Sequence, residues 1–239
     1  MFYNSNGQIT EGSQITIGLK NRAFNYGDGV FESIKFSNGR LNFWEDHYFR
    51  LMSSMRIVRM EIPLSFSPEH LEEQIRLTIE ANGLTKQAAR IRFVVYRKEG
   101  GLYTPESNDV EYIITATPTE NTSYILNETG LVVDVFKDFY KQKSLLSTIK
   151  SSSAQFYAVA SVFRKENGLD ECILLNDDKS VCEAISANVF LVKGEELITP
   201  PLSDGCLKGV MRKNVITAAK KLGYKVIEKS FSPFEIQKA

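Results

Sequence analysis

Residues 31–44, FESIKFSNGRLNFW, set the structural class of the first third of the chain. Apolar and polar side chains alternate through residues 31–36, as in a strand with one buried face. Asn38 and Gly39 then favour the positive φ angles of a tight hairpin turn, and LNFW begins a returning strand. The stretch therefore predicts a β-hairpin that leads into a helix.

Two amphipathic helices are expected after this hairpin. The first runs from residue 44 to about residue 58, with His47 and Arg50 on or beside one turn and an apolar stripe of Trp44, Tyr48, Leu51 and Met55. The second begins near Ser67 and Pro68, a cap followed by a first-turn proline, and ends at Asn82 and Gly83, with a stripe of Leu71, Ile75 and Ile79. Strands at residues 89–96 and 112–117 complete an α+β unit.

A polar, turn-rich segment, PTENTSYILNETG at residues 118–130, separates this block from a second one. We therefore expect an N-terminal domain at residues 1–118, a linker at 119–130 and a C-terminal domain at 131–239. In the second block the patterns predict a strand at GLVVDVF, a basic loop to Lys150 and a helix over residues 154–167. Strands are expected near 172–175, 181–182 and 189–192. A final helix lies between Gly209 and Gly223, with a buried face of Val215, Ile216, Ala219 and Leu222.

Composition indicates an ordinary soluble globular protein, with 43% hydrophobic and 24% charged residues. The 29 Lys and Arg residues balance the 29 Asp and Glu residues, so we expect neither nucleic acid nor an acidic membrane as a partner. No apolar run approaches the ~18 residues of a membrane span, and the first residues show no targeting pattern. We expect a cytoplasmic protein.

Cysteine and histidine usage argues against several chemistries. Cys172, Cys182 and Cys206 are an odd number without C-x-x-C spacing, which disfavours a disulfide framework and structural zinc. His47 and His70 lie in different expected helices without metal-ligand spacing, so we expect no metal site. The G-x-S-x-G, G-x-G-x-x-G and G-x-x-x-x-G-K-[ST] motifs are also missing. Any chemistry is therefore expected to use an organic cofactor.

Lys150 and Glu183 each have a structural and a functional interpretation. Lys150, in STIKSSSAQF, has no acidic neighbour in sequence and could place a nucleophilic amine in a cavity, or could be a solvated lysine after Lys141 and Lys143. Glu183, in SVCEAISANVFLV, would need a partner if buried, or could face water in a turn. Asn188 at the end of that run is typical of a turn.

A helix N-terminus and an arginine could together bind a phosphate group. In TPPLSDGCLKGVMRKNV, the free N–H groups of Val210 and Met211 begin the last expected helix, where the helix dipole favours an anion. Arg50 could supply a guanidinium, which suits phosphate geometry. Its alternative is a surface ion pair with Asp46, four residues earlier.

Taken together, these segments resemble the class IV, or fold-type IV, pyridoxal-phosphate-dependent aminotransferases. This family includes branched-chain aminotransferase, D-amino-acid aminotransferase and aminodeoxychorismate lyase. The resembling segments are, in the family's order, NRAFNYGDGVFESIKF, EDHYFRL, the Lys150 segment, VCEAISANVFLV and TPPLSDGCLKGVMR. The resemblance implies a small α/β N-terminal domain and a larger, β-barrel-like C-terminal domain.

The resemblance also assigns site residues. Lys150 matches the lysine that forms the aldimine with pyridoxal 5'-phosphate and then moves the substrate α-proton, and Glu183 matches the acid that pairs with the pyridine nitrogen. Arg50 with the Val210 and Met211 amides matches the phosphate cradle, and Asn188 matches an asparagine that helps to position the ring. The implied reaction is ping-pong transfer of an amino group from an amino acid, branched-chain-like, to a 2-oxo acid. The implied assembly is a homodimer.

The chain departs from the family pattern at three places. Ser153 stands where the family often has asparagine, three positions after the lysine. Phe31 lies near the substrate where D-amino-acid aminotransferase has tyrosine, and the VFE pattern fits branched-chain enzymes. The sequence ends at FSPFEIQKA, where family members continue through a segment with another phosphate-binding hydroxyl, so we expect a truncated C-terminus.

Two alternatives to transamination remain open. The segment YRKEGGLYTP at residues 96–105 lies where the family builds its substrate loop, and its two glycines resemble aminodeoxychorismate lyase, which forms 4-aminobenzoate and pyruvate. Arg97 could bind a substrate carboxylate there, or could be solvated beside a turn. A catalytically inactive family member with a structural role is the other alternative. We favour the aminotransferase.

Overall fold

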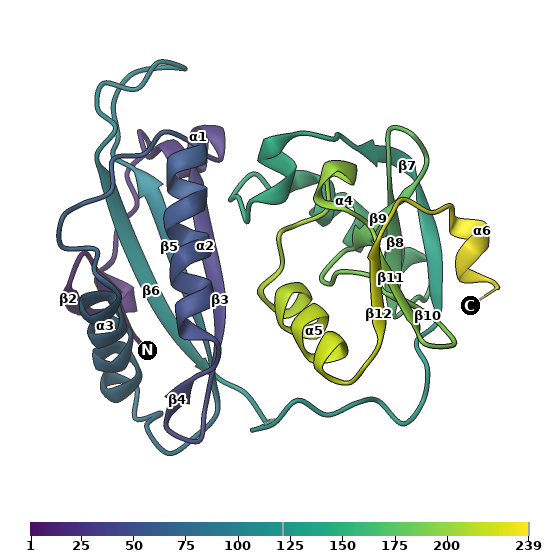
Figure 1. Cartoon of the computed structure of the whole chain (residues 1–239). Coiled ribbons are helices and arrows are strands. Elements are labelled where there is room, and N and C mark those ends of the chain that lie inside the picture. The colour runs from purple at the N-terminus through teal and green to yellow at the C-terminus, as the bar shows by residue number, and fades with distance from the viewer. Residues whose placement is uncertain (121, 239) are drawn as a thin grey trace. The chain divides into compact units, whose positions relative to one another are not determined.

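The computed structural model describes residues 1–120 and 122–238, which form two compact units (Figure 1). The first unit contains Met1–Leu126 together with Lys150–Ser153, and the second contains Asn127–Ile149 and the rest of the chain. The division after Leu126 lies inside the expected linker. The four residues that begin with Lys150 were expected in the C-terminal domain, but they group with the first unit because their backbone pairs with its sheet.

A six-stranded antiparallel sheet forms the centre of the first unit, in the order β2-β1-β6-β5-β3-β4. Its strands are β1 (Phe2–Ser5), β2 (Gln8–Glu11), β3 (Gly29–Ser37), β4 (Arg40–Leu41), β5 (Ala89–Arg97) and β6 (Val110–Pro118). The expected hairpin at Asn38 and Gly39 is confirmed. Its returning strand is shorter than LNFW indicates, because the next helix begins at Trp44.

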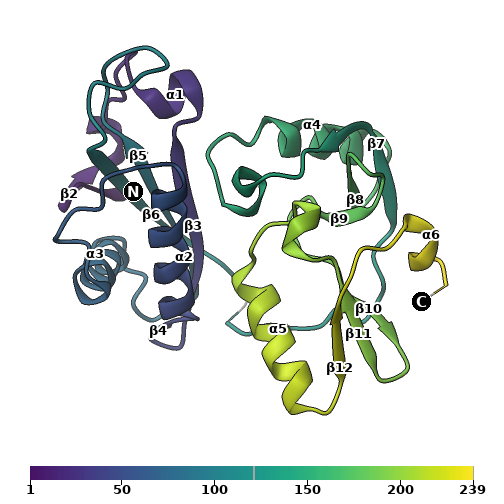
Figure 2. The same cartoon turned by 45° about the horizontal axis from the view of Figure 1, so that its top comes forward.

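Helices cover one face of this sheet (Figure 2). They are α2 (Trp44–Ile57) and α3 (Pro68–Ala81), and the short η1 (Gly12–Gln14) and α1 (Arg22–Tyr26) precede β3. Ser67 caps α3 by accepting a hydrogen bond from the His70 amide, as expected from Ser67 and Pro68. Burial along β3 alternates, so Glu32 and Ile34 face the helices while Phe31 and Ser33 face the opposite side.

Two three-stranded sheets make up the second unit, in the orders β7-β8-β9 and β10-β11-β12. The strands are β7 (Val133–Lys141), β8 (Glu171–Asn176), β9 (Val181–Ala184), β10 (Leu191–Lys193), β11 (Glu196–Thr199) and β12 (Lys225–Glu228). The helical elements are η2 (Leu145–Thr148), α4 (Gln155–Glu166), η3 (Leu202–Asp204), α5 (Val210–Lys221) and α6 (Pro233–Ile236). One apolar cluster includes Ile173, Val181 and Phe231, and another is centred on Phe136 and Leu174.

Three expectations for the second unit need correction. Strands β11 and β12 were not expected, because each has four residues and little alternation to mark it. The expected buried face of α5 is wrong at Leu222, which is 76% exposed as the residue that follows the helix, while Arg212 is buried. The unit is also the smaller of the two, whereas the resemblance implies a larger C-terminal domain.

Membrane spans were searched among the described residues. None of their helices has the length and apolar character that crossing a bilayer requires.

Candidate active site

Lys150 lies on the edge of β3 in the first unit. The Phe31 amide donates to the Lys150 carbonyl at 2.9 Å, and the Ser152 amide donates to the Gly29 carbonyl at 2.8 Å. Lys150 Nζ lies 4.8 Å from the centroid of the Phe31 ring, within the range of a cation–π contact. The sheet edge therefore fixes the backbone of Lys150 and places its amine beside Phe31.

Glycines in NYGDG allow this close approach. A Cβ atom on Gly27 would lie 3.1 Å from Cα and Cβ of Ser153, and Gly27 also has a φ of +65°, which favours glycine. A Cβ atom on Gly29 would lie 2.9 Å from Ser152 Oγ and 3.2 Å from a carbonyl oxygen of β5. The two glycines of NYGDG, which belong to a segment that resembles the family, are therefore needed to make room for the residues that follow Lys150.

Arg92 is a candidate site residue that sequence reasoning missed. Its guanidinium carbon lies 3.8 Å from the centroid of the Phe31 ring, the same ring that Lys150 contacts. Partial burial, together with the charge of Arg90, lowers the pKa of Arg92 from its usual value. Alternation along β5 could have revealed it, since apolar residues at 89, 91 and 93 put Arg92 on the face that the helices leave uncovered.

Arg50 points to the helix-covered side of β3, where it pairs with Glu32. Arg50 Nε donates to Glu32 Oε1 at 2.8 Å, and a second guanidinium nitrogen contacts Oε2. His47 Nδ1 lies 2.7 Å from the same Oε2. Burial alone would raise the pKa of Glu32, but hydrogen bonds and charges from Arg50 and His47 lower it overall. Glu32 is therefore a buried ion-pair partner that orients Arg50.

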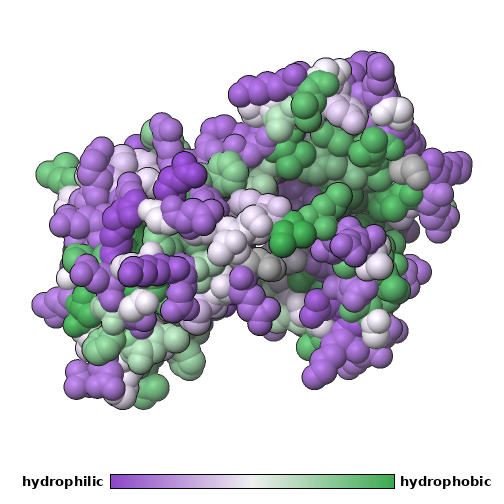
Figure 3. Space-filling view, turned by 90° about the horizontal axis from the view of Figure 1, so that it is seen from below, coloured by the Kyte–Doolittle hydropathy of each residue, from purple (hydrophilic) through white to green (hydrophobic). Residues whose placement is uncertain are grey.

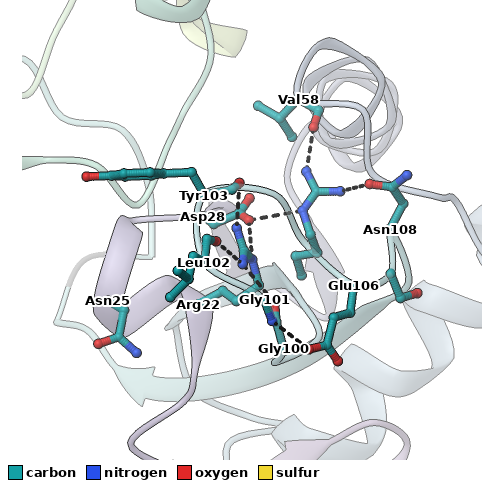
Figure 4. A network of polar contacts seen from close by, with 12 residues as sticks. Arg22, Asn25, Asp28, Val58, Gly100, Gly101, Leu102, Tyr103, Glu106 and Asn108 are labelled. Atoms are coloured by element: carbon teal, nitrogen blue, oxygen red, sulfur yellow. Dashed lines mark hydrogen bonds and ion pairs between the residues drawn. The ribbon is translucent and has the colours of Figure 1, made fainter.

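Arg97 bonds to a separate polar network, whose residues Asp28, Val58 and Asn108 are labelled in Figure 4. Its guanidinium donates to Asp28 Oδ2 at 3.0 Å, to the Val58 carbonyl at 2.7 Å and to the Arg59 carbonyl at 3.2 Å, and it also contacts Asn108. The residue is 5% exposed. The structure thus engages Arg97 with internal oxygens, and a role in substrate binding stays a prediction.

A second buried arginine in this network holds the expected substrate loop. Arg22 bonds Asp28 Oδ2 at 2.8 Å and donates to the carbonyls of Gly100 and Leu102 at 2.9 and 2.7 Å. Gly101 has a φ of +72°, and a Cβ atom there would lie 2.1 Å from the Thr104 carbonyl oxygen. Arg22 and a glycine-dependent turn therefore fix the conformation of this loop.

Glu183 is buried in the second unit, where it is 3% exposed and has three donors. Lys141 Nζ lies 2.5 Å from Oε1, and the Tyr157 hydroxyl donates to the same oxygen at 2.7 Å. The Leu207 amide donates to Oε2 at 2.7 Å. Glu183 is thus a partnered buried acid rather than a turn carboxylate facing water, which fits one of the two interpretations of its sequence context.

Asn188 contacts the loop that leads into α5. Its Nδ2 donates to the Leu207 carbonyl at 2.9 Å, and a Cβ atom on Gly209 would lie 2.0 Å from its Oδ1. Leu207 is therefore bonded through its amide to Glu183 and through its carbonyl to Asn188. This arrangement makes Asn188 a support for the start of α5, and its expected role in positioning the ring stays a prediction.

The start of α5 has the properties of an anion site. Gly209 is the N-cap and offers no side chain to the first turn. The amides of Val210 and Met211 belong to the first turn of the helix, where no preceding turn supplies carbonyl acceptors. The helix dipole adds positive potential at this end. The lack of a capping side chain leaves these amides available to a phosphate group.

Comparisons with known proteins identify the family. The model of the family described as "Amino-transferase class IV" matches residues 29–239. The chain belongs to the class IV aminotransferase family. The chain is 29% identical to a putative branched-chain-amino-acid aminotransferase of Methanocaldococcus jannaschii, across 98% of this chain and 80% of the relative. It is 26% identical to the aminodeoxychorismate lyase of Vibrio harveyi, across 89% of this chain and 77% of the relative.

A solved structure agrees with this assignment. The branched-chain aminotransferase of Thermoproteus uzoniensis, crystallised with norvaline, superposes with a TM-score of 0.88 at 28% identity. The match covers 100% of this class IV aminotransferase and 81% of the archaeal chain. The expected fold and family are therefore confirmed, and the protein is an enzyme whose family cofactor is pyridoxal 5'-phosphate.

The residues of this class IV aminotransferase fit that cofactor. A carboxylate has about four acceptor sites, and the three donors on Glu183 leave about one of them for a ring nitrogen. The first turn of α5 suits a phosphate, and Lys150 supplies a primary amine on a fixed backbone.

Proposed function

We propose that this enzyme transfers the amino group of a branched-chain amino acid to a 2-oxo acid by a ping-pong mechanism. The observation that carries the proposal is the placement of Lys150, whose amine lies beside an aromatic ring on a sheet edge in a class IV aminotransferase. Pyridoxal phosphate, when bound, supplies the electron sink that stabilises negative charge at the substrate Cα.

Each of the chain's own residues then has a defined task. Lys150 would hold the cofactor through its amine and would move the proton at the substrate Cα as general base and acid. Glu183 would accept a hydrogen bond from the ring nitrogen. The amides of Val210 and Met211 would hold the phosphate, and Arg50, oriented by Glu32, would add a guanidinium to it.

Phe31 and Arg92 support an apolar amino acid as the substrate. The ring gives an apolar wall beside Lys150, and the Arg92 guanidinium next to the same ring is a cation suited to a substrate carboxylate. An apolar side chain with a carboxylate is what a branched-chain amino acid presents. The likeness to the archaeal branched-chain enzyme supports this choice.

Aminodeoxychorismate lyase chemistry, which yields 4-aminobenzoate and pyruvate, is the second candidate. It is favoured by the likeness to the Vibrio harveyi lyase and by the Gly100–Gly101 turn in the loop that Arg22 holds. A catalytically inactive member with a structural role is a third reading. The buried partners of Glu183 and the fixed backbone of Lys150 argue against an inactive protein.

A homodimer is part of the proposal. The second unit exposes large apolar side chains, which include Phe139, Tyr140, Leu145 and Leu146. Figure 3 separately shows hydrophobic side chains on the face of that unit seen from below. Patches of this kind commonly mark interfaces. Light scattering that gives the mass of one chain would contradict the dimer.

Product assays test the proposed reaction. We expect the purified protein with pyridoxal phosphate to convert branched-chain amino acids to their oxo acids only when a 2-oxo acid acceptor is present. Lys150→Ala should abolish the reaction. Release of pyruvate from aminodeoxychorismate without an acceptor would select the lyase instead, and no turnover of either kind would select the inactive reading.

A further inference from the structure

The contacts of Glu183 divide into one charged donor and two neutral ones. Lys141 is the cation in direct contact with the carboxylate, and both residues are at least nine-tenths buried. Lys141 Nζ also donates to the Ser147 carbonyl at 3.1 Å and lies 5.3 Å from the Tyr157 ring centroid. These contacts fix the ammonium at Oε1, whereas Oε2 receives only the Leu207 amide among the described residues.

The other titratable groups around Glu183 do not compensate its charge. Burial, followed by the charge and hydrogen bond of Glu183, raises the pKa of Tyr157 above its usual range, so its hydroxyl stays a neutral donor. Burial raises the pKa of Cys206 to about 11 and also raises that of Cys182. Asp204 has the same sign as Glu183 when ionised. Arg212 is a cation near Cys206, but it pairs with Glu228. Lys141 is therefore the cation in direct contact with this carboxylate.

We propose that Lys141 is a positioning residue that divides the charge of Glu183 between its own ammonium and the cofactor's ring nitrogen. The inference rests on the proposed role of Glu183. An ammonium at Oε1 repels a protonated ring nitrogen that bonds to the same carboxylate, and the repulsion is strong at short range in a buried site. Lys141 thus weakens the interaction between the Glu183 carboxylate and a protonated ring nitrogen, while Tyr157 and the Leu207 amide keep the carboxylate oriented.

The first experiment measures thermal unfolding of the protein without cofactor. Lys141→Met leaves a buried carboxylate without its cation, and we expect Tm at pH 8 to fall by roughly 5 °C. Lys141→Arg should restore Tm, and Lys141→Met should cost nothing in a Glu183→Gln background. Lys143→Met, which removes an exposed ion pair with Asp178, is the matched control.

The second experiment compares binding of pyridoxal phosphate with binding of its 1-deaza analogue, which has C–H in place of the ring nitrogen. We expect Lys141→Met to increase the preference for pyridoxal phosphate by about tenfold, which corresponds to one pKa unit of interaction with the ring. Lys141→Arg and Lys143→Met should keep the wild-type preference, because the charge at Oε1 is retained in both.

The outcomes separate this inference from the proposed function. If wild-type protein binds pyridoxal phosphate but Lys141→Met shows an unchanged or reduced preference, the division of charge is wrong and Lys141 acts on stability alone. Wild-type protein that binds neither compound overturns both the inference and the proposed cofactor role of Glu183. A raised preference with recovery in Lys141→Arg supports the inference.

Discussion

Phe31 and Glu32 are neighbours in β3, and their side chains engage two different sets of cations. Phe31 contacts Lys150 and Arg92 on one face, and Glu32 binds Arg50 and His47 on the other. Successive side chains of a strand point to opposite faces, so two adjacent positions serve both the lysine and the arginine expected to bind phosphate. A one-residue shift of β3 would disrupt both groups.

Removal of the Glu32 charge should destabilise the first unit. Glu32→Gln leaves Arg50 buried with a weakened partner, and we expect the free energy of unfolding at pH 7 to fall by about 3 kcal/mol. Because the folded-state pKa of Glu32 is lowered, its contribution is present at neutral pH and is lost as the pH falls below about 5. Urea unfolding at pH 7 and at pH 4 should therefore show a smaller difference from wild type at the lower pH.

Glu72→Gln is the control for this prediction. Glu72 pairs with Arg76 one turn later on α3, and the pair is partly exposed. Its loss should cost less than about 1 kcal/mol. Equal effects of the two substitutions would show that the buried Glu32 pair contributes no more than a surface pair.

Sequence patterns identified some of the residues that the structure brings together and missed others. Lys150, Glu183 and Asn188 stand in segments whose order resembles the family, so they were named without knowledge of their contacts. Lys141 is 42 positions from Glu183, and a contact over that distance leaves no local signal. The same holds for Arg50 and Glu32, which are 18 positions apart.

At the level of elements, the close approach of two backbone segments positions the residues around Lys150. Residues 150–152 pair with the first residues of β3, and Gly27 and Gly29 leave room for Ser152 and Ser153. The glycines therefore serve the geometry of Lys150 although neither lies near it in sequence.

Gly27→Ala should weaken cofactor binding through this contact. Alanine at a φ of +65° costs about 1–2 kcal/mol of stability, and its Cβ would press on Ser153 at 3.1 Å. Displacement of the Lys150 segment should then reduce affinity for pyridoxal phosphate at least about tenfold. Equilibrium binding monitored by absorbance measures the loss.

Gly168→Ala is the control that separates the cost of backbone strain from the effect of displacing the Lys150 segment. Gly168 has the same φ of +65°, but no atom lies within 4 Å of its added Cβ. It should lose similar stability and keep wild-type affinity. If both variants bind pyridoxal phosphate equally well, the glycine at position 27 does not position the lysine.

The starts of α3 and α5 were predictable, and several of the short strands were not. Ser67 and Pro68 carry the cap and first-turn signals, so the start of α3 matches the expectation, and Gly209 correctly precedes α5. Strands β1, β2, β11 and β12 have four residues each, and their pairing with distant segments defines them more than their own sequences do. Leu222 was misassigned because an apolar residue at helical spacing need not be buried once the helix has ended.

At the level of the whole molecule, each unit contributes its own part of the chemistry. The first unit holds Lys150, Phe31 and Arg50, and the second holds Glu183 and the start of α5. Lys150 follows directly on Ile149 of the second unit, so the chain itself passes from one set of residues to the other. The class IV family model matches residues 29–239, which include both sets, and their use of one cofactor is part of the proposed function.

Covalent attachment of pyridoxal phosphate to Lys150 is the most direct test of this account. The protein is incubated with the cofactor, reduced with borohydride, digested and examined by mass spectrometry, with Lys150→Ala and the exposed-lysine variant Lys165→Ala in parallel. We predict that the cofactor mass appears on the peptide containing Lys150 in wild type and Lys165→Ala and is lost in Lys150→Ala. Specific attachment to another lysine, or none in wild-type protein, would contradict the assignment of Lys150.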